Sequence, residues 1–151
     1  MASGKWQSKI QNPKSKIMKI LCLTARLPYP PDRGDRLRAF NFIRQLSREH
    51  ELSLVSFITS EAEREQAAVL RQYCQEVRVV QLTSLQSAAN VALNLWRPEP
   101  LQVLYYRSAA MQRLVNEVLA SGPFNVAYVH LFRMAPYLWQ GASRTSRRLA
   151  A

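Results

Sequence analysis

The sequence predicts an α/β protein with a doubly wound, parallel, Rossmann-like sheet. Short apolar runs with the length of buried strands alternate along the chain with longer amphipathic stretches that are typical of helices. Hydrophobic residues make up 48% of the 151 residues, which is enough for a sizeable core, and only 4 glycines are present, which excludes glycine-rich repeats. Because a parallel strand pair needs a helical crossover, this alternation favours one parallel sheet with right-handed connections.

The first strand, loop and helix are expected near the N-terminus. Residues 18–24 read Met-Lys-Ile-Leu-Cys-Leu-Thr, a short apolar run of the kind found in buried parallel strands. Residues 25–34 contain three prolines, which exclude a helix there. A helix is expected to begin near Asp35 and to end near His50. Its apolar side chains recur on one face: Leu37, Phe40, Ile43 and Leu46.

The second strand is expected at residues 52–58 and the second helix at residues 60–73. The strand reads Leu-Ser-Leu-Val-Ser-Phe-Ile, which is bounded by polar residues. Ser60 followed by Glu63 three residues later is a capping-box pattern, in which each side chain satisfies a backbone N–H of the helix start. The acidic residues of this helix start are expected to be exposed: Glu61, Glu63 and Glu65.

The alternation continues in the middle of the chain. Residues 77–82 predict a third strand, and residues 85–96 predict a third amphipathic helix. Pro98 and Pro100 end that helix, because proline cannot continue the helical hydrogen bonds. Residues 102–106 are ambiguous, and a short extended piece is the expectation.

The last helix, strand and helical turn follow. Ser108 is expected to cap a helix that ends at Gly122 and Pro123, with the glycine in the position where a left-handed backbone is common. Residues 124–131 predict a further strand, and residues 134–139 predict a short helical turn.

Basic residues concentrate at the two ends of the sequence. The formal net charge is +11, but residues 20–140 hold 13 basic and 10 acidic residues, which leaves only +3 there. Three segments are therefore expected: a disordered basic tail over residues 1–17, a domain over residues 18–140 and a polar tail over residues 141–151. Basic tails suit loose attraction to anionic lipid or polyphosphate, and tails that only solubilise the chain are the alternative.

The cysteine content and the apolar stretches also indicate the cellular compartment. Cys22 and Cys74 are too few for a disulfide framework or a metal cluster. Cys22 lies in an apolar run and Cys74 at the end of a helical pattern, and both are interpreted as small apolar fillers in a reducing compartment. The apolar stretches are shorter than the roughly 20 residues that a membrane span needs, and the N-terminus lacks the apolar core of a secretory signal. A cytoplasmic protein is expected, with peripheral contact to the inner face of the membrane as an open possibility.

The loop after the first strand is the most informative candidate site. In open α/β sheets, ligands bind beyond the carboxyl ends of the strands. Gly34 stands alone, without the pattern of a dinucleotide fingerprint or a P-loop, but a glycine at a helix start lets an anion approach backbone N–H groups. Arg33 and Arg36 add donors that fit phosphate or carboxylate. The alternative is a simple turn with Asp35 as the helix N-cap.

The loop after the last strand supplies the second group of candidates. His130 is expected at the strand end, where its imidazole can hydrogen-bond a sugar hydroxyl or a developing phosphate charge. Tyr128 shares the face of His130 because side chains two residues apart in a strand point the same way. Arg133 lies in the same loop. The alternative is a histidine whose hydrogen bonds are made by the backbone.

Three segments resemble group 1, or family 4, glycosyltransferases, with the bacterial exopolysaccharide-type sugar transferases as the nearest pattern. Residues 18–36 are similar to the opening of these enzymes, and residues 50–55 are similar to their second strand. Residues 124–130, Phe-Asn-Val-Ala-Tyr-Val-His, resemble the family segment Phe-Asp-Val-Val-His-Val-His. The chain departs from that segment at Asn125 and Tyr128, which leaves it one imidazole short.

This resemblance implies the GT-B fold, in which two Rossmann-like domains face a cleft. The chain corresponds to an incomplete N-terminal half that binds the acceptor, and the domain that binds most of the nucleotide sugar is missing. His130 is the implied catalytic candidate. The implied substrate-binding candidates also border the cleft: Arg33, Gly34, Asp35, Arg36, Tyr128 and Arg133.

The implied activity is retaining glycosyl transfer from a nucleotide sugar in polysaccharide or glycolipid synthesis, without a metal or a separate cofactor. The implied partners are a sugar or lipid-linked acceptor, the nucleotide sugar and a donor-domain chain in trans, with no specific nucleic acid. The chain alone is expected to be inactive. The alternatives are a basic binding module for nucleic acid or anionic lipid, and a truncated gene product without function.

Overall fold

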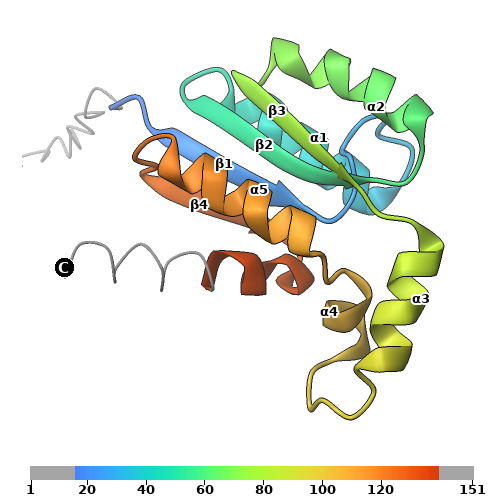
Figure 1. Ribbon diagram of the computed structural model, residues 1–151. Helices are drawn as coiled ribbons and strands as arrows, with labels where there is room; N and C mark the ends of the chain where they lie inside the picture. The colour runs from blue at the N-terminus through green and yellow to red at the C-terminus, as the bar shows by residue number, and fades with distance from the viewer. Residues whose placement is uncertain (1–15, 140–151) are drawn as a thin grey trace, which may run out of the picture.

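A computed structural model of the chain describes residues 16–139. Within this range, four strands form one sheet in the order β3-β2-β1-β4, and all neighbouring strands are parallel (Figure 1). The strands are β1 (Lys19–Thr24), β2 (Glu51–Ile58), β3 (Glu76–Gln81) and β4 (Val126–His130). The predicted α/β fold with a doubly wound, Rossmann-like sheet is confirmed. Apart from residues 16 and 17, the predicted tails lie outside the described residues.

Helices cover both faces of this sheet. They are α1 (Gly34–Leu46), α2 (Glu61–Ala67), the 3-10 helix η1 (Ala68–Gln72), α3 (Ser84–Leu93), α4 (Leu101–Tyr105), α5 (Ala109–Ala120) and the 3-10 helix η2 (Phe132–Met134). Residues 135–139 continue from η2 in helical conformation. Figure 1 shows α1 and α2 on one side of the sheet, α5 and the segment after β4 on the other, and α3 and α4 projecting away from it.

The core consists of two apolar clusters, one on each face of the sheet. Successive side chains of a strand point to opposite faces, so β1 sends Ile20 and Cys22 into one cluster and Leu21 and Leu23 into the other. The first cluster lies under α1, α2 and η1, and it also holds Cys74. Burial raises the pKa of both cysteine thiols to about 12, so they remain protonated, apolar fillers of the core.

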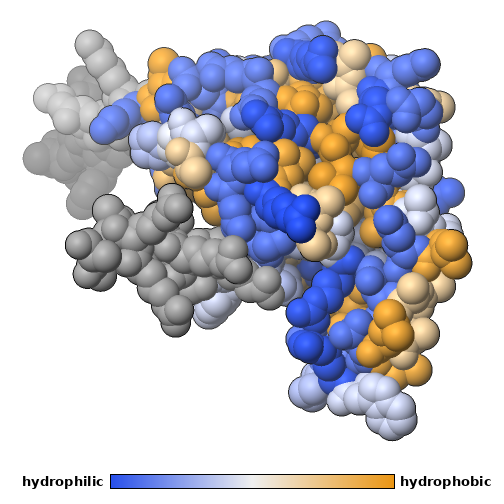
Figure 2. All heavy atoms as spheres, viewed as in Figure 1, coloured by the Kyte–Doolittle hydropathy of each residue, from blue (hydrophilic) through white to orange (hydrophobic). Residues whose placement is uncertain are grey.

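The projecting part of the chain carries large exposed apolar side chains. They lie on α3 and on the turn that follows it: Leu85, Leu93, Leu95 and Trp96. Figure 2 shows patches of hydrophobic surface on the part of the molecule that extends from the sheet. Among residues 16–139, none of the helices combines the length and the apolar character that crossing a membrane requires.

Two local predictions are wrong. Residues 101–105 form the short helix α4 instead of an extended piece, because the carbonyl of Pro100 accepts hydrogen bonds from the N–H groups of Val103 and Leu104. Helix α5 does end before Gly122, but not through a left-handed glycine. Its C-cap Ser121 stays in the right-handed region, and the hydroxyl of Ser121 donates to the carbonyl of Val118 over 2.8 Å.

Candidate functional site

The strand order reverses direction at β1, which defines a crevice at the carboxyl edge of the sheet. From β1 the chain proceeds to β2 and β3 on one side, whereas β4 pairs with β1 on the other side. The loop after β1 leads to α1 on one face, and the loop after β4 leads to η2 on the opposite face. Such a reversal is where open α/β sheets bind ligands. In the sheet register, Thr24 at the end of β1 pairs with His130 at the end of β4.

His130 is held as a neutral imidazole at this edge. Burial lowers its pKa, and this effect outweighs the carboxylate and the backbone of nearby Asp35, which both favour the charged form. The Tyr128 hydroxyl lies 3.1 Å from Nδ1 of His130, and the ring of Tyr128 stacks on Phe42 of α1 at a centroid distance of 4.0 Å. If the phenol O–H donates to Nδ1, the imidazole proton resides on Nε2, which then serves as a hydrogen-bond donor.

Two buried polar atoms at this edge have no hydrogen-bond partner among residues 16–139. They are Thr24 Oγ1 and His130 Nε2, which belong to the paired residues that end β1 and β4. Buried polar groups in proteins nearly always have a partner, so these two atoms mark a place suited to a polar ligand.

The start of α1 is open on the same side. Arg33 is the N-cap residue and makes no side-chain hydrogen bond to the helix, while Asp35 lies inside the first turn. The alternative in which Asp35 caps the helix is therefore wrong. A Cβ atom placed on Gly34 would meet no atom within 4 Å, and its φ is not positive, so neither packing nor backbone geometry requires glycine there. The open space beside Gly34 leaves room for a ligand near the first backbone N–H groups of α1.

Arg36 points away from this opening and into an ion pair. Its Nη2 lies 2.6 Å from Oε1 of Glu63, and its Nη1 lies 3.6 Å from Oδ1 of Asp32. Oε2 of Glu63 accepts hydrogen bonds from both the backbone N–H and the hydroxyl of Thr59. The expectation that Glu63 is exposed is wrong, because the residue is only 9% exposed. Only one of the two hydrogen bonds of the capping box forms. The Ser60 side chain accepts a hydrogen bond from the N–H of Glu63, whereas the Glu63 carboxylate accepts hydrogen bonds from Thr59 and Arg36 instead.

The turn after β4 carries local backbone strain. Leu131 has φ 74° and ψ 134°, a region that non-glycine residues rarely adopt. Strained residues of this kind cost about 1–3 kcal/mol and occur preferentially at functional sites. The turn sends Arg133 to the face opposite α1, where its guanidinium stacks over the ring of Tyr106 at 4.9 Å. Arg33 is exposed at the helix start.

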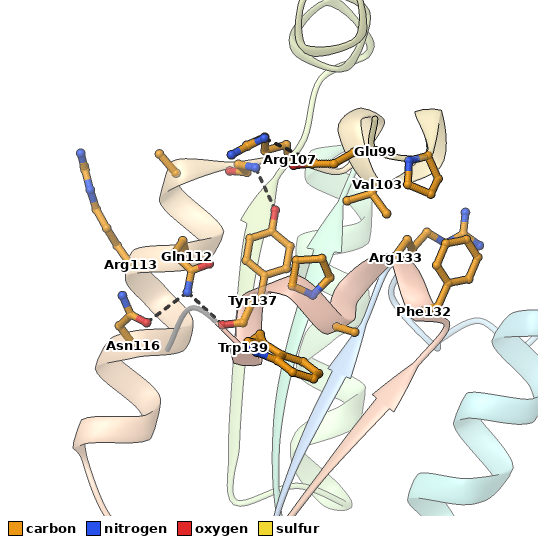
Figure 3. A pocket seen from close by; sticks show the side chains of 15 residues that line it. Glu99, Val103, Arg107, Gln112, Arg113, Asn116, Phe132, Arg133, Tyr137 and Trp139 are labelled. Carbon is orange, nitrogen blue, oxygen red and sulfur yellow. Dashed lines mark hydrogen bonds and ion pairs between the residues drawn. The ribbon is translucent and has the colours of Figure 1, made fainter. Parts of the chain in front are cut away.

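The structure therefore divides the predicted site residues into three groups. His130, Tyr128, Gly34 and Asp35 lie around the crevice between β1 and β4, with Arg33 exposed at the adjoining helix start. Arg36 is committed to Glu63. Arg133 borders a second feature that the sequence did not reveal, a cavity of about 870 Å³ between α4, the start of α5 and residues 132–139 (Figure 3).

Thr24 and Glu63 were also not identified from the sequence. Thr24 ends an otherwise apolar strand, and a threonine in that position is a weak sequence signal for a buried hydroxyl. The pairing of Glu63 with Arg36 joins residues 27 positions apart and left no local signal.

The fold and the crevice define the class of the protein as Rossmann-like α/β with a candidate ligand site at the strand reversal. Comparison of the chain with protein-family models, with curated proteins and with solved structures gives no match. In the described residues, no group of three or more histidine, cysteine or acidic side chains is placed to hold a metal ion.

Proposed function

We propose that the chain is the acceptor-binding, N-terminal portion of a nucleotide-sugar-dependent glycosyltransferase of the GT-B type. The observation that carries the proposal is the pair of unpartnered polar atoms at the strand reversal, Thr24 Oγ1 and His130 Nε2, beside the open start of α1. Hydroxyl, imidazole and backbone N–H groups are the partners that a sugar and a phosphate require. The similarity of residues 18–36 and 124–130 to family 4 glycosyltransferases supports the same assignment.

In this proposal, His130 contributes a hydrogen bond rather than a charge. Its lowered pKa keeps the imidazole neutral near pH 7, so Nε2–H donates to a hydroxyl of the reacting sugar. Tyr128 holds the ring in that tautomer through Nδ1. The first-turn N–H groups of α1, with Arg33 beside them, face the donor phosphates across Gly34. Arg36 is a positioning residue, because its pair with Glu63 fixes the first turn of α1.

Transfer also needs a second wall to the cleft. The nucleotide sugar binds mainly to a second Rossmann-like domain, whose helix dipoles and basic residues neutralise the leaving diphosphate without a metal. Holding donor and acceptor together supplies much of the rate of such a reaction, so the chain by itself is expected to have no transferase activity. The acceptor is a sugar or a lipid-linked sugar, and the protein works in the cytoplasm, where nucleotide sugars are the donors.

The test is a transfer assay on the purified chain, alone and with the donor domain of a family 4 glycosyltransferase supplied by fusion or in trans. Labelled nucleotide sugars serve as donors and a panel of mono- and disaccharides as acceptors. Transfer only in the presence of the donor domain is expected, together with its loss in Gly34→Val, in which the new side chain occupies the space over the α1 start. Absence of transfer with every donor domain and acceptor would argue against the proposal.

The rival function, a basic module that binds nucleic acid or anionic lipid, is tested on the same protein. Removing residues 1–17 and 141–151 leaves a body with little excess charge. Under the glycosyltransferase proposal, this deletion abolishes binding to heparin or to anionic vesicles. Salt-sensitive polyanion binding by the trimmed chain would favour the binding module instead.

A further inference from the structure

The cavity beside β4 has the dimensions and the lining of a ligand site. Its volume of about 870 Å³ lies within the range of about 300–1,000 Å³ that small-molecule pockets occupy. It is bordered by α4, by the first half of α5 and by residues 132–139 (Figure 3). Neither the predicted site residues nor the crevice between β1 and β4 accounts for this cavity, apart from Arg133 at its margin.

The charge of the lining favours an anion. Three arginines and a single acidic residue border the cavity: Arg107, Arg113, Arg133 and Glu99. Glu99 is engaged with Arg107 at 3.4 Å, so Arg113 and Arg133 have no carboxylate partner in the described part of the chain. Arg133 is held in place by its stacking over Tyr106, and its Nε is buried without a hydrogen-bond partner. A guanidinium that is fixed and unpaired in this way is suited to a carboxylate or phosphate group.

The remainder of the lining suits a sugar ring. Phe132 and Trp139 are 59% and 82% exposed, and Figure 3 shows Trp139 next to Tyr137 and Phe132 next to Arg133. Aromatic faces of this kind cover the apolar faces of sugar rings. Gln112 donates through Nε2 to Asn116 Oδ1 and to the carbonyl of Tyr137, over 3.1 and 2.9 Å. No described residue engages Gln112 Oε1 or Asn116 Nδ2, so an acceptor and a donor remain for sugar hydroxyls.

The framework around these groups is rigid. The hydroxyl of Tyr137 accepts a hydrogen bond from the N–H of Ser108 at 2.8 Å and donates to the carbonyl of Tyr106, so it ties residues 132–139 to the start of α5. Tyr137 and Tyr106 are both only 6% exposed. A site whose walls are fixed before the ligand arrives loses less conformational entropy on binding.

We infer that this cavity binds an acidic saccharide, with its oxyanion at the Arg133 end of the cavity and its sugar hydroxyls towards Trp139, Gln112 and Asn116. The inference deepens the proposed function, because it specifies that the acceptor carries an acidic group. Arg133 follows His130 by three residues in the turn after β4, so its end of the cavity adjoins the crevice between β1 and β4 along the chain.

The experiment is a fluorescence titration of the full chain carrying Trp6→Phe and Trp96→Phe, in which Trp139 is the remaining indole. The probes are glucuronic acid, glucose 1-phosphate, glucose and inorganic phosphate, so that the carboxylate and phosphate sources of the oxyanion are compared directly. The inference predicts saturable quenching by at least one acidic sugar, and at least about tenfold weaker binding of glucose and of inorganic phosphate, since each lacks one part of the recognition.

Three variants separate the site from general charge effects. Arg133→Lys keeps the charge but loses the planar guanidinium, and we expect it to weaken binding of the acidic sugar by about tenfold. Arg113→Gln, on the exposed rim, is expected to weaken it by about threefold or less, because an exposed charge is screened. Arg44→Gln removes the same charge at the far end of α1 and is expected to change nothing.

The inference is overturned by an absence of saturable quenching with both acidic sugars, by equal affinity for glucose, or by Arg133→Lys binding like Arg44→Gln. Circular dichroism of each variant establishes that it is folded. The titration needs no donor domain, so its failure is distinct from a failure of glycosyl transfer. Binding of acidic sugars without transfer would support the cavity inference and not the proposed function. Transfer without binding of acidic sugars in the cavity would do the opposite.

Discussion

Replacing Glu63 by glutamine tests how the start of α1 is held at the candidate site. The Glu63 carboxylate accepts hydrogen bonds from Arg36, from the N–H of Thr59 and from the hydroxyl of Thr59, at 2.6, 2.7 and 3.0 Å. The side chains of Arg36 and Glu63 are only 14% and 12% exposed. Glutamine has nearly the same shape, so Glu63→Gln removes the negative charge while keeping one acceptor oxygen.

The expected loss follows from this geometry. Removing one partner of a buried ion pair costs about 3–5 kcal/mol, because the other charge is left buried. Asp32 still lies 3.6 Å from Arg36, and the pair is not fully buried, so we expect about 2–3 kcal/mol for Glu63→Gln. The matched control is Glu61→Gln on the same helix turn. Its side chain is 69% exposed and pairs with Arg64 at 2.8 Å, and such exposed pairs contribute at most about 1 kcal/mol.

The assay is urea unfolding followed by circular dichroism, with the slope of the transition checked for equality among the variants. The pH dependence provides a second readout. Although burial raises the pKa of Glu63, the hydrogen bonds from Thr59 and Arg36 lower it further, so the folded pKa lies below the ordinary value of 4.5. The carboxylate therefore stabilises the fold fully above pH 4.5, and this contribution is lost as the pH falls towards the folded pKa. Equal stability of Glu63→Gln and Glu61→Gln at neutral pH would refute the reasoning.

Two further predictions concern the crevice itself. Gly34→Ala is expected to fold and to raise the free energy of unfolding by up to about 1 kcal/mol, because the added methyl group meets no atom and restricts the unfolded chain. Urea unfolding measures this change, and a loss of stability would mean that the backbone requires glycine there. His130 is expected to titrate below its ordinary pKa of 6.5, with the proton of the neutral ring on Nε2, as nitrogen NMR of the imidazole reports. Because the unfolded chain then takes up the proton first, His130 lowers stability as the pH falls below 6.5, and a measured pKa above 6.5 would contradict its burial.

The sequence predicted the sheet and its helices well because their signals are local. The apolar run at residues 18–24 and the helical period after Gly34 each report directly on one strand or one helix, and both formed where expected. The short helix α4 was missed because five residues between a proline and a turn leave too little periodicity to separate helix from strand. The prediction that α5 ends at a left-handed glycine, Gly122, was wrong because Ser121 caps the helix instead.

The candidate site was predictable only where chain position determines it. His130 and Tyr128 could be placed together because a strand alternates strictly, and their side chains do meet. Arg36 looked equally available in the sequence, but a glutamate from a different helix engages its guanidinium. The cavity could not be foreseen, since its walls come from three separate segments and its polar atoms are ordered by contacts between them.

The measurement that tests the central claim most directly is the ratio of transfer rates for the wild-type chain and His130→Ala, each fused to the same donor domain. The account predicts that kcat/KM falls by about 100-fold or more, in the range expected when a positioned group that acts on the reacting sugar is removed. Urea unfolding of the unfused His130→Ala chain establishes that its fold is retained. A retained fold with a transfer rate within about twofold of the wild type would show that the crevice between β1 and β4 is not where transfer takes place.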